Sequence, residues 1–239
     1  MTLSVKNIGK KIYGRKIVHD VSFDVGKGEI VGLLGPNGAG KSTSFYITVG
    51  LTGADVGKIF LDDQDITNFP AFQRARLGIV YLPQESSIFS NMTVEENIIV
   101  ALEISEKDKE KHQPSLTNLL DEFSISHLKD IKGFALSGGE RRRVEIARCL
   151  ATKPSYILLD EPFAGIDPIA VSDIKKLLVQ LKNNNIGVLI TDHNVKDALS
   201  IVDRGYVIYD GRVLANGLTE DLIVNPEVKK FYLGEDFRF

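Results

Sequence analysis

Short apolar runs alternate with helix-like segments along most of the chain. Four runs are short enough and rich enough in β-branched residues to predict buried strands: Glu29 to Leu34, Gly78 to Leu82, Tyr156 to Leu159 and Gly187 to Thr191. The spacing of apolar residues predicts helices over Ser42 to Leu51, Phe69 to Leu77 and Ile169 to Asn183. Strands and helices that alternate in this way favour an α/β fold.

The N-terminal and middle segments depart from this alternation. Leu3 to Ile8 and Val18 to Val25 alternate apolar and polar residues on either side of a turn at residues 13–16, which predicts two antiparallel strands. Thr93 with Glu96 has the spacing of a capping box, so a helix is predicted to begin there. Leu116 to Phe123 is also helical in its spacing, and the middle of the chain is therefore predicted to be helical.

A phosphate-binding loop lies between the first buried strand and the helix after it. It fits G-x-x-x-x-G-K-[ST] at every fixed position, with the residues Gly35, Pro36, Asn37, Gly38, Ala39, Gly40, Lys41, Ser42 and Thr43. The glycines let consecutive N–H groups turn toward a polyphosphate at the positive end of the helix. Lys41 is then expected to reach the β and γ phosphates and Ser42 to ligate Mg²⁺, with Thr43 supporting the helix start. A glycine-rich turn that binds nothing is the alternative, which the strand-loop-helix context disfavours.

Composition and charge restrict the possible partners. The 239 residues carry a net charge of −3 with lysines and arginines scattered among acids, so nucleic acid is not an expected partner. The single cysteine, Cys149, cannot form an intrachain disulfide, and the first ten residues lack the apolar core of a secretory signal, which together favour the cytoplasm. No apolar run is long enough to insert into a membrane directly. Any membrane role must then act through a partner.

Polar residues follow three of the predicted strands. Asp160 and Glu161 follow one strand, where the first carboxylate can hold Mg²⁺ and the second can accept a proton from an attacking water. His193 follows another strand, where α/β folds place groups that contact ligands. Gln84 follows a third, and its amide can reach a metal or a water, although a lone glutamine there is more often a plain surface residue.

A second anion-binding helix start is predicted at Ser137, Gly138 and Gly139. Ser137 with Glu140 again has the spacing of a capping box, and the paired glycines leave N–H groups of the first turn uncovered. Three arginines follow, at positions 141–143. Helical spacing distributes them around the axis, so we expect them to be mostly solvated or paired with Glu140 and Glu145.

The ordered set of these motifs resembles the ATPase subunits of ABC transporters over nearly the whole chain. The set comprises the phosphate loop, Gln84, Leu136 to Glu140, Asp160, Glu161, Asp167 and His193. The family usually has glutamine where this chain has Glu140. The resemblance implies one α/β domain over residues 1–239, with a RecA-like core, an antiparallel β subdomain and a helical subdomain inserted at roughly residues 85–150.

The resemblance also implies roles for individual residues. Tyr13 would stack on the adenine of ATP. From the residue alone, the alternative is a half-exposed tyrosine in a strand. Glu161 would be the base on water, His193 a γ-phosphate contact, and Gln84 the link between Mg²⁺ and a membrane subunit. Two copies would hold ATP between them, as a homodimer, with the phosphate loop of one copy facing Ser137 of the other.

Within the family, several segments are similar to the ATPases that power lipopolysaccharide export. They are Phe45 with Tyr46, Tyr81 to Glu85, Gly139 to Arg148, Phe163 to Gly165, Thr191 to Val195 and the tail Tyr232 to Arg238. An ATPase of a branched-chain amino acid importer is the second hypothesis, and a non-transport ABC protein is the third. A groove near Gln84 would receive the membrane subunits. Phe72, Ile88 and Phe89 are its candidate residues, with core packing as the alternative for each.

Overall fold

Ten strands form a single sheet in the computed structural model, which describes residues 1–234 and 237. The strand order across the sheet is β5-β4-β1-β2-β10-β9-β3-β8-β7-β6. The strands are β1 (Thr2–Ile12), β2 (Arg15–Gly26), β3 (Ile30–Leu34), β4 (Val56–Leu61), β5 (Gln64–Asp65), β6 (Ile79–Leu82), β7 (Tyr156–Asp160), β8 (Gly187–Thr191), β9 (Arg204–Tyr209) and β10 (Arg212–Leu218). The predicted α/β class is confirmed.

One half of the sheet is largely parallel and carries the predicted site. β9, β3, β8, β7 and β6 run parallel to one another, with Ile30 paired to Val188 and Tyr156 paired to Gly187. All five residues of β3, β7 and β8 are buried, as the continuous apolar runs predict. Because the strands are parallel, the polar residues that follow β3, β6, β7 and β8 all lie at one edge of the sheet.

The other half of the sheet is antiparallel. β1 pairs with β2 and with β4, and β4 pairs with β5. The two halves are linked where β10 meets β2, at the pair Arg212 and Asp20. The predicted hairpin over the N-terminal strands is confirmed, with a tight turn at Tyr13 and Gly14.

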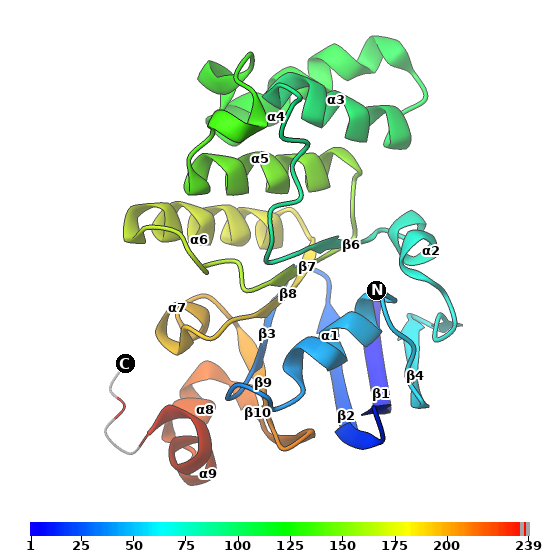
Figure 1. The fold of residues 1–239 in the computed structure, drawn as a ribbon, viewed down its shortest axis with the longest axis vertical. Coiled ribbons are helices and arrows are strands. Elements are labelled where there is room, and N and C mark those ends of the chain that lie inside the picture. The colour runs from blue at the N-terminus through cyan, green and yellow to red at the C-terminus, as the bar shows by residue number, and fades with distance from the viewer. Residues whose placement is uncertain (235–236, 238–239) are drawn as a thin grey trace.

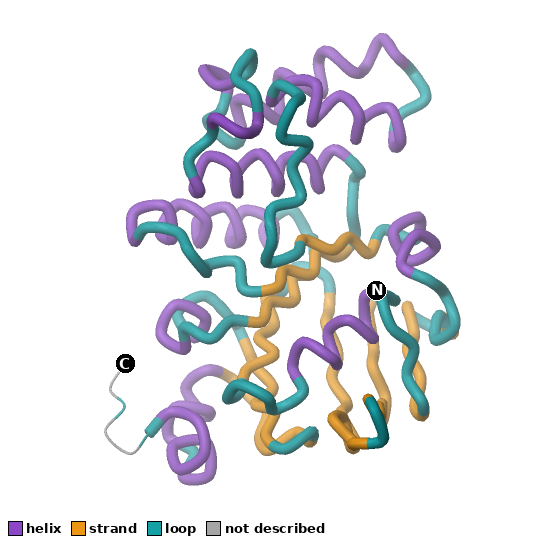
Figure 2. Tube along the Cα trace, in the orientation of Figure 1, coloured by secondary structure: helices purple, strands orange, loops and turns teal. Residues whose placement is uncertain are grey.

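Helices pack on both faces of the sheet and on one another. They are α1 (Lys41–Val49), α2 (Ala71–Arg76), α3 (Val94–Ser105), α4 (His112–Glu122), α5 (Gly138–Ala151), α6 (Pro168–Asn183), α7 (Val195–Leu199), α8 (Thr219–Val224) and α9 (Pro226–Val228), with a π-helical turn over Lys229–Leu233. α3, α4 and α5 follow β6 and precede β7, and they form the upper part of Figure 1. Figure 2 shows the strands gathered below them, with α6 between.

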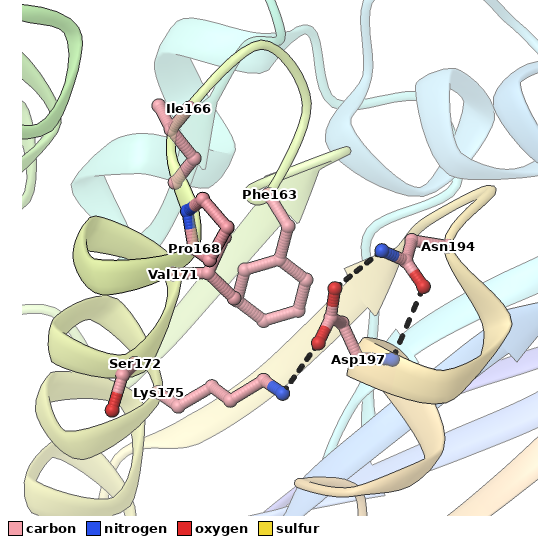
Figure 3. Close-up of a pocket in the computed structure, with 8 residues that line it drawn as sticks. All are labelled: Phe163, Ile166, Pro168, Val171, Ser172, Lys175, Asn194 and Asp197. Atoms are coloured by element: carbon pink, nitrogen blue, oxygen red, sulfur yellow. Dashed lines mark hydrogen bonds and ion pairs between the residues drawn. The ribbon is translucent and has the colours of Figure 1, made fainter.

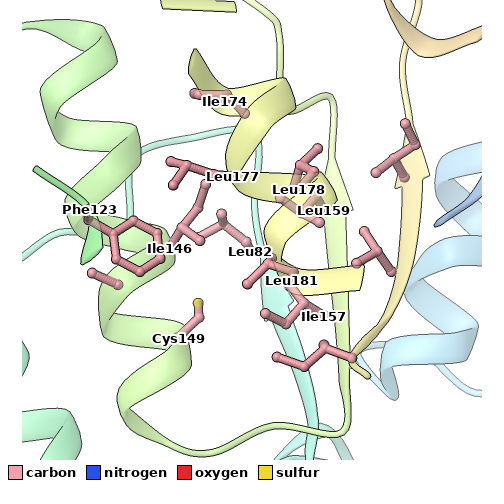
Figure 4. Packing of buried hydrophobic residues seen from close by; sticks show 14 of the residues in the cluster. Leu82, Phe123, Ile146, Cys149, Ile157, Leu159, Ile174, Leu177, Leu178 and Leu181 are labelled. Carbon is pink, nitrogen blue, oxygen red and sulfur yellow. The ribbon is translucent and has the colours of Figure 1, made fainter. Parts of the chain in front are cut away.

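Two apolar clusters hold these layers together. The larger cluster joins α5 and α6 to one face of the sheet, and Figure 4 shows Ile146 and Cys149 of α5 near Leu177 and Leu181 of α6. The second cluster packs Phe45 and Ile47 of α1 against the antiparallel strands and the opposite face of the sheet. α1, which begins at the phosphate loop, is therefore fixed between two buried surfaces.

Local sequence signals place most helix ends correctly. Thr93 caps α3 and Glu96 completes the predicted capping box, and Asp167 caps α6 through the N–H groups of Ile169 and Ala170. α2 is shorter than predicted, beginning at Ala71. Glu235, Asp236 and Arg238 of the tail motif lie outside the described residues.

Candidate functional site

The phosphate loop connects β3 to α1 in a backbone conformation that its glycines allow. Gly35 and Gly40 have φ of 140° and 101°. A Cβ built on Gly35 would lie 2.1 Å from the carbonyl oxygen of Ile208, and one on Gly40 would lie 2.9 Å from the carbonyl oxygen of Ile17. These two positions therefore require glycine for both backbone conformation and space.

Lys41 is buried inside this loop. Its Nζ donates to the carbonyl oxygens of Gly35, at 2.7 Å, and Pro36, at 2.9 Å. Burial lowers the pKa of Lys41, and the nearby carboxylates of Glu161 and Asp160 oppose that shift. The ammonium is thus held at the start of α1 in contact with the loop backbone.

The phosphate loop and Glu161 line one cavity of about 170 Å³. The cavity is lined by Ile17, Asn37, Gly38, Gly40, Lys41, Ser42, Thr43 and Glu161. The structure thus brings Glu161, from the end of β7, to the residues of the predicted phosphate loop. Ile17 was not predicted, because an apolar residue in a strand carries no local sign of a site.

The two carboxylates after β7 differ in their surroundings. Asp160 is buried and its Oδ1 accepts a hydrogen bond from Thr191 Oγ1 at 2.5 Å. Glu161 has a φ of 45°, which is uncommon for a residue with a side chain. Its N–H donates to the carbonyl oxygen of Thr191 at 2.9 Å. Thr191 of β8 therefore holds both residues in place.

Gln84 and His193 both contact the side chain of Glu161. Gln84 Nε2 donates to Glu161 Oε2 at 2.8 Å, and His193 Nδ1 lies 3.1 Å from the same oxygen. The three residues come from the loops after β6, β7 and β8. The structure thus brings together three residues that the sequence analysis placed after three different strands.

The turn after β8 is fixed by Asp192. This carboxylate is fully buried and accepts from the N–H groups of Phe163 and Asn194, at 3.2 and 2.7 Å. Burial raises the pKa of Asp192, and those hydrogen bonds oppose the rise. Asp192 therefore ties the residues around His193 to the segment that follows Glu161. The sequence analysis gave Asp192 no role.

A further ion pair joins α6 to α7 beside this turn. Lys175 Nζ lies 2.7 Å from Asp197 Oδ1, and Asn194 caps α7 by accepting from the N–H of Asp197. Figure 3 shows this pair at one side of a cavity of about 280 Å³, with the Phe163 ring and Ile166 on the other side. The ion pair thereby ties α6, which follows the turn at Asp167, to α7, which follows the turn at His193.

The predicted helix start at Ser137 is formed, with its capping box, at α5. Ser137 Oγ accepts from the N–H of Glu140, and Glu140 Oε2 accepts from Ser137 N and Oγ at 2.8 and 2.7 Å. These hydrogen bonds lower the pKa of Glu140. A Cβ on Gly139 would lie 2.7 Å from that of Ala170, so α5 approaches α6 closely there.

The three arginines were predicted to be mostly solvated or paired with Glu140 and Glu145, and Arg142 is paired with Glu145 but in a buried position. Its side chain is 7% exposed and Nη1 lies 3.2 Å from Glu145 Oε2, which is also buried. Arg142 Nη1 also donates to the carbonyl oxygen of Pro83, and Glu145 accepts from the N–H of Ser87. The face of α5 that carries these two residues packs on the loop containing Gln84, and helical spacing alone did not reveal that contact.

Tyr13 lies at the tip of the β1–β2 hairpin. It is fully exposed and has a φ of 48°. The alternative of a half-exposed strand position is therefore wrong, because Tyr13 lies in the turn between the strands. The strand after this turn carries Ile17, which lines the phosphate-loop cavity.

The residues present suit Mg²⁺ bound together with phosphates. No group of three His, Cys, Asp or Glu side chains that could hold a metal is found among the described residues. Mg²⁺ at nucleotide sites is normally held by one or two carboxylates together with substrate phosphates. A buried carboxylate at Asp160 and an exposed hydroxyl at Ser42, the first turn of α1, provide ligands of that kind.

Comparison with known proteins agrees with this geometry. The model of the ABC transporter family matches residues 18–164, so the chain belongs to the ABC transporter family. A probable ABC transporter ATP-binding protein of Azorhizobium caulinodans is 55% identical over 99% of this chain and 84% of its own length.

The chain is also similar over nearly its full length to proteins named for one transport system. The lipopolysaccharide export system ATP-binding protein LptB of Escherichia coli K12 is 51% identical, and that of Haemophilus influenzae is 52% identical; each match covers 99% of this chain and at least 98% of the relative. A crystal structure of the ADP conformation of MJ1267, an ATP-binding cassette of an ABC transporter, superposes with a TM-score of 0.87 at 32% identity, covering 98% of this chain and all of MJ1267. No helix in the described part of the chain is long and apolar enough to cross a membrane.

Proposed function

We propose that this protein is the ATP-hydrolysing subunit of a transporter that exports lipopolysaccharide from the inner membrane. Full-length similarity to LptB proteins, at 51–52% identity, supports the choice of cargo. The single structural observation that carries the proposed activity is the position of Glu161, which lines the phosphate-loop cavity together with Lys41 and Ser42. The protein would act at the cytoplasmic face of the membrane, through partners.

Each residue of the site has a proposed task in hydrolysis. Backbone N–H groups of the phosphate loop bind the phosphates of ATP, and Lys41 exchanges its two carbonyl acceptors for phosphate oxygens. Glu161 accepts the proton of the attacking water, while His193 contacts the γ-phosphate. Ser42, Asp160 and Gln84 would hold Mg²⁺. The ion would stabilise the negative charge that develops on the phosphate oxygens during hydrolysis.

We further propose that two copies enclose the nucleotide head to tail. The phosphate loop and Tyr13 of one copy would face Ser137, Gly138 and Gly139 of the other. The separate helix start at α5, with exposed Ser137 and Gly138, supports this arrangement because it is a second anion-binding site far along the chain from the first. A dimeric structure of MJ0796 bound to ADP and Pi, 25% identical to this chain, provides a precedent.

Sedimentation tests the dimer. The Glu161→Gln protein should sediment as a dimer in saturating ATP with Mg²⁺ and as a monomer without nucleotide, because ATP binding no longer leads to turnover. A monomer under both conditions would contradict the head-to-tail arrangement. Glu103→Gln, an exposed carboxylate on α3, is the matched control, and it should hydrolyse ATP as the unmodified protein does.

The proposed groove for the membrane subunits lies beside the loop that carries Gln84. Phe72 and Phe89 are 58% and 49% exposed and suit it, whereas Ile88 is buried and belongs to the core. Helices α3, α4 and α5, within roughly residues 85–150, would form the subdomain that carries the groove.

Purifying the protein from native membranes and identifying what accompanies it tests the transport assignment. Membrane subunits of an amino acid importer in place of export subunits would overturn the cargo.

A further inference from the structure

Arg74 is a buried residue of α2 to which the proposed function gives no task. Its side chain is 1% exposed, and it forms no ion pair among the residues that the structure describes. The guanidinium bonds to the backbone instead. Nη1 donates to the carbonyl oxygens of Ile47 and Thr48 at 2.8 and 2.6 Å. Nε donates to that of Phe69 at 2.8 Å, and Nη2 to that of Thr67 at 2.9 Å.

These hydrogen bonds join two helices. Two of the carbonyls lie in the last turn of α1, the helix that begins at the phosphate loop, and the other two lie in the segment that leads into α2. The carbonyl oxygen of Gly50, which follows α1, accepts from the N–H of Ala71, the first residue of α2, at 3.1 Å. A Cβ on Gly50 would lie 2.9 Å from Arg74 Nε. The end of α1 and the start of α2 are therefore in close contact.

The charge of Arg74 suits the end of α1 that it contacts. The last carbonyl groups of a helix carry partial negative charge, and a cation there is stabilised. Burial lowers the pKa of Arg74 to about 10, so the group is positively charged at neutral pH. An apolar side chain could fill the space without burying a charge, but it could not bond to both segments, whereas the planar guanidinium has five N–H donors. Arg74 is therefore a connector between α1 and α2.

The two connected helices lead to different parts of the proposed machinery. At the first residue of α1, Lys41 bonds to two loop carbonyls that it would leave for phosphate oxygens. α2 carries Phe72, an exposed residue of the proposed groove, and it precedes β6, the strand before Gln84. Movement of α1 on nucleotide binding would therefore reach both the groove and the Gln84 loop through α2.

We propose that Arg74 is a positioning residue that couples nucleotide binding at the phosphate loop to α2 and its partner surface at Phe72. This role rests on the proposed nucleotide site. α1 is a short helix of nine residues, so a rearrangement of its first turn also displaces its last turn, where Nη1 holds two carbonyls. Nε and Nη2 hold the segment before α2, which then follows the displacement. Coupling is reciprocal, so a partner that fixes α2 changes nucleotide affinity by the same factor.

Hydrogen–deuterium exchange on the full chain tests this coupling. Exchange of the α2 amides is followed by mass spectrometry in a peptide covering residues 69–78, with and without saturating ADP and Mg²⁺. ADP should slow this exchange by about fivefold, the low end of typical coupling between two sites. α2 does not line the phosphate-loop cavity, so bound phosphates do not cover its amides directly. Arg74→Lys has three donors on one atom and cannot bridge both segments, so its α2 should exchange faster and respond little to ADP.

Arg76→Lys is the matched control. Arg76 is an exposed residue of the same helix that lies over the Phe72 ring, so this variant should keep the full response to ADP. A purely structural Arg74 would speed exchange in Arg74→Lys but leave the fivefold response intact, and that result overturns the proposal. The ring contacts of Tyr81 with Phe45 and Tyr46 would then be the connection to test.

A second measurement needs no substitution. The ¹⁵N–¹H resonance of the Arg74 Nε–H group in the unmodified chain should shift when ADP binds. An unshifted resonance, or α2 exchange that ADP leaves unchanged, overturns the coupling even if Arg74→Lys fails to fold. Calorimetric titration with ADP separates this result from the proposed function. No binding at all would contradict the nucleotide site, whereas normal binding without a response of α2 would contradict only the role of Arg74.

Discussion

Gln84 Nε2 donates to Glu161 Oε2 across a separation of 77 residues. The bond joins the loop after β6 to the end of β7, and it occupies an oxygen that His193 also contacts. In the isolated protomer the proposed base is therefore engaged by two neighbours. Movement of the Gln84 loop would change the hydrogen bonding of the proposed base, which would make this loop a natural place for a membrane partner to act on hydrolysis.

Replacing Glu161 by Gln should reduce ATP turnover by roughly 10² to 10⁴, the usual contribution of a positioned general base. ATP binding should be retained, because Lys41 and the loop backbone are unchanged. Steady-state hydrolysis together with equilibrium ATP binding measures both effects. Retained turnover would reassign the base, with His193 the first candidate because it lies 3.1 Å from the same carboxylate.

The sequence alone predicts what depends on local chemistry. Both capping boxes, at Thr93 and Ser137, and the phosphate loop are formed by residues at most a few positions apart, and all have the predicted structure. Contacts between distant segments could not be predicted in the same way. Arginine is usually an exposed residue, yet the loop before Ser87 covers Arg142, and Glu145 forms an ion pair with it.

The same contrast applies to the candidate site. Gln84, Glu161 and His193 each follow a buried strand, so their meeting at one edge of the sheet was predictable from the parallel order. The arrangement of hydrogen bonds on Glu161 was not, because it depends on side-chain directions in three loops. Thr191, which supports Asp160 and Glu161, had no motif to identify it.

Glu140→Ala should destabilise the protein slightly at neutral pH. Ser137 N and Oγ lose their acceptor, which at this partly exposed helix end should cost about 0.5 kcal/mol, the low end for a helix cap. Because the pKa of Glu140 is lowered by folding, its stabilisation is present above the ordinary glutamate pKa and fades as the pH falls through the lowered value. Urea unfolding measures this effect: the difference in unfolding free energy between the variant and the unmodified protein should be smaller at acid pH than at neutral pH.

Glu140→Gln is the control for that prediction. Its amide oxygen can still accept from Ser137, so stability at neutral pH should remain close to that of the unmodified protein. The loss of unfolding free energy at acid pH that arises from Glu140 should disappear, since an amide does not titrate. An equal loss for the alanine variant at both pH values would show that the capping carboxylate does not titrate with folding.

Arg74→Met should destabilise the protein strongly. The buried guanidinium donates to the carbonyl oxygens of Phe69, Ile47, Thr48 and Thr67, two of which lie near the C-terminal end of α1. Burial lowers the pKa of Arg74 to about 10, so the side chain remains charged at neutral pH. Four carbonyls, two of them in buried and two in part-buried hydrogen bonds, would lose their donor, which should cost about 3 kcal/mol of unfolding free energy. Arg76→Met, at an exposed position in the same helix, should unfold at nearly the original urea concentration.

Tyr13→Ala should weaken ATP binding by several-fold, since stacking on an aromatic ring contributes roughly 0.5 to 1.5 kcal/mol. Tyr13→Phe keeps the ring and should bind ATP normally, which separates stacking from any role of the hydroxyl. Because Tyr13 is fully exposed, neither change should affect unfolding through lost packing. Calorimetric titration with ATP measures the affinities. Equal affinity of the alanine variant would remove Tyr13 from the nucleotide site.

Phe89→Glu should block assembly with the membrane subunits while leaving ATP hydrolysis by the purified chain intact. The ring is half exposed and stacks under the Arg148 guanidinium at 5.0 Å, so a carboxylate there replaces an apolar surface with a charge. The backbone should stay in place, because Asn97 bonds both the N–H and the carbonyl oxygen of Phe89. Ile104→Glu, an equally drastic change at an exposed apolar position of α3 outside the proposed groove, should assemble normally in the same co-purification. Assembly that survives Phe89→Glu as well would place the membrane subunits on another surface.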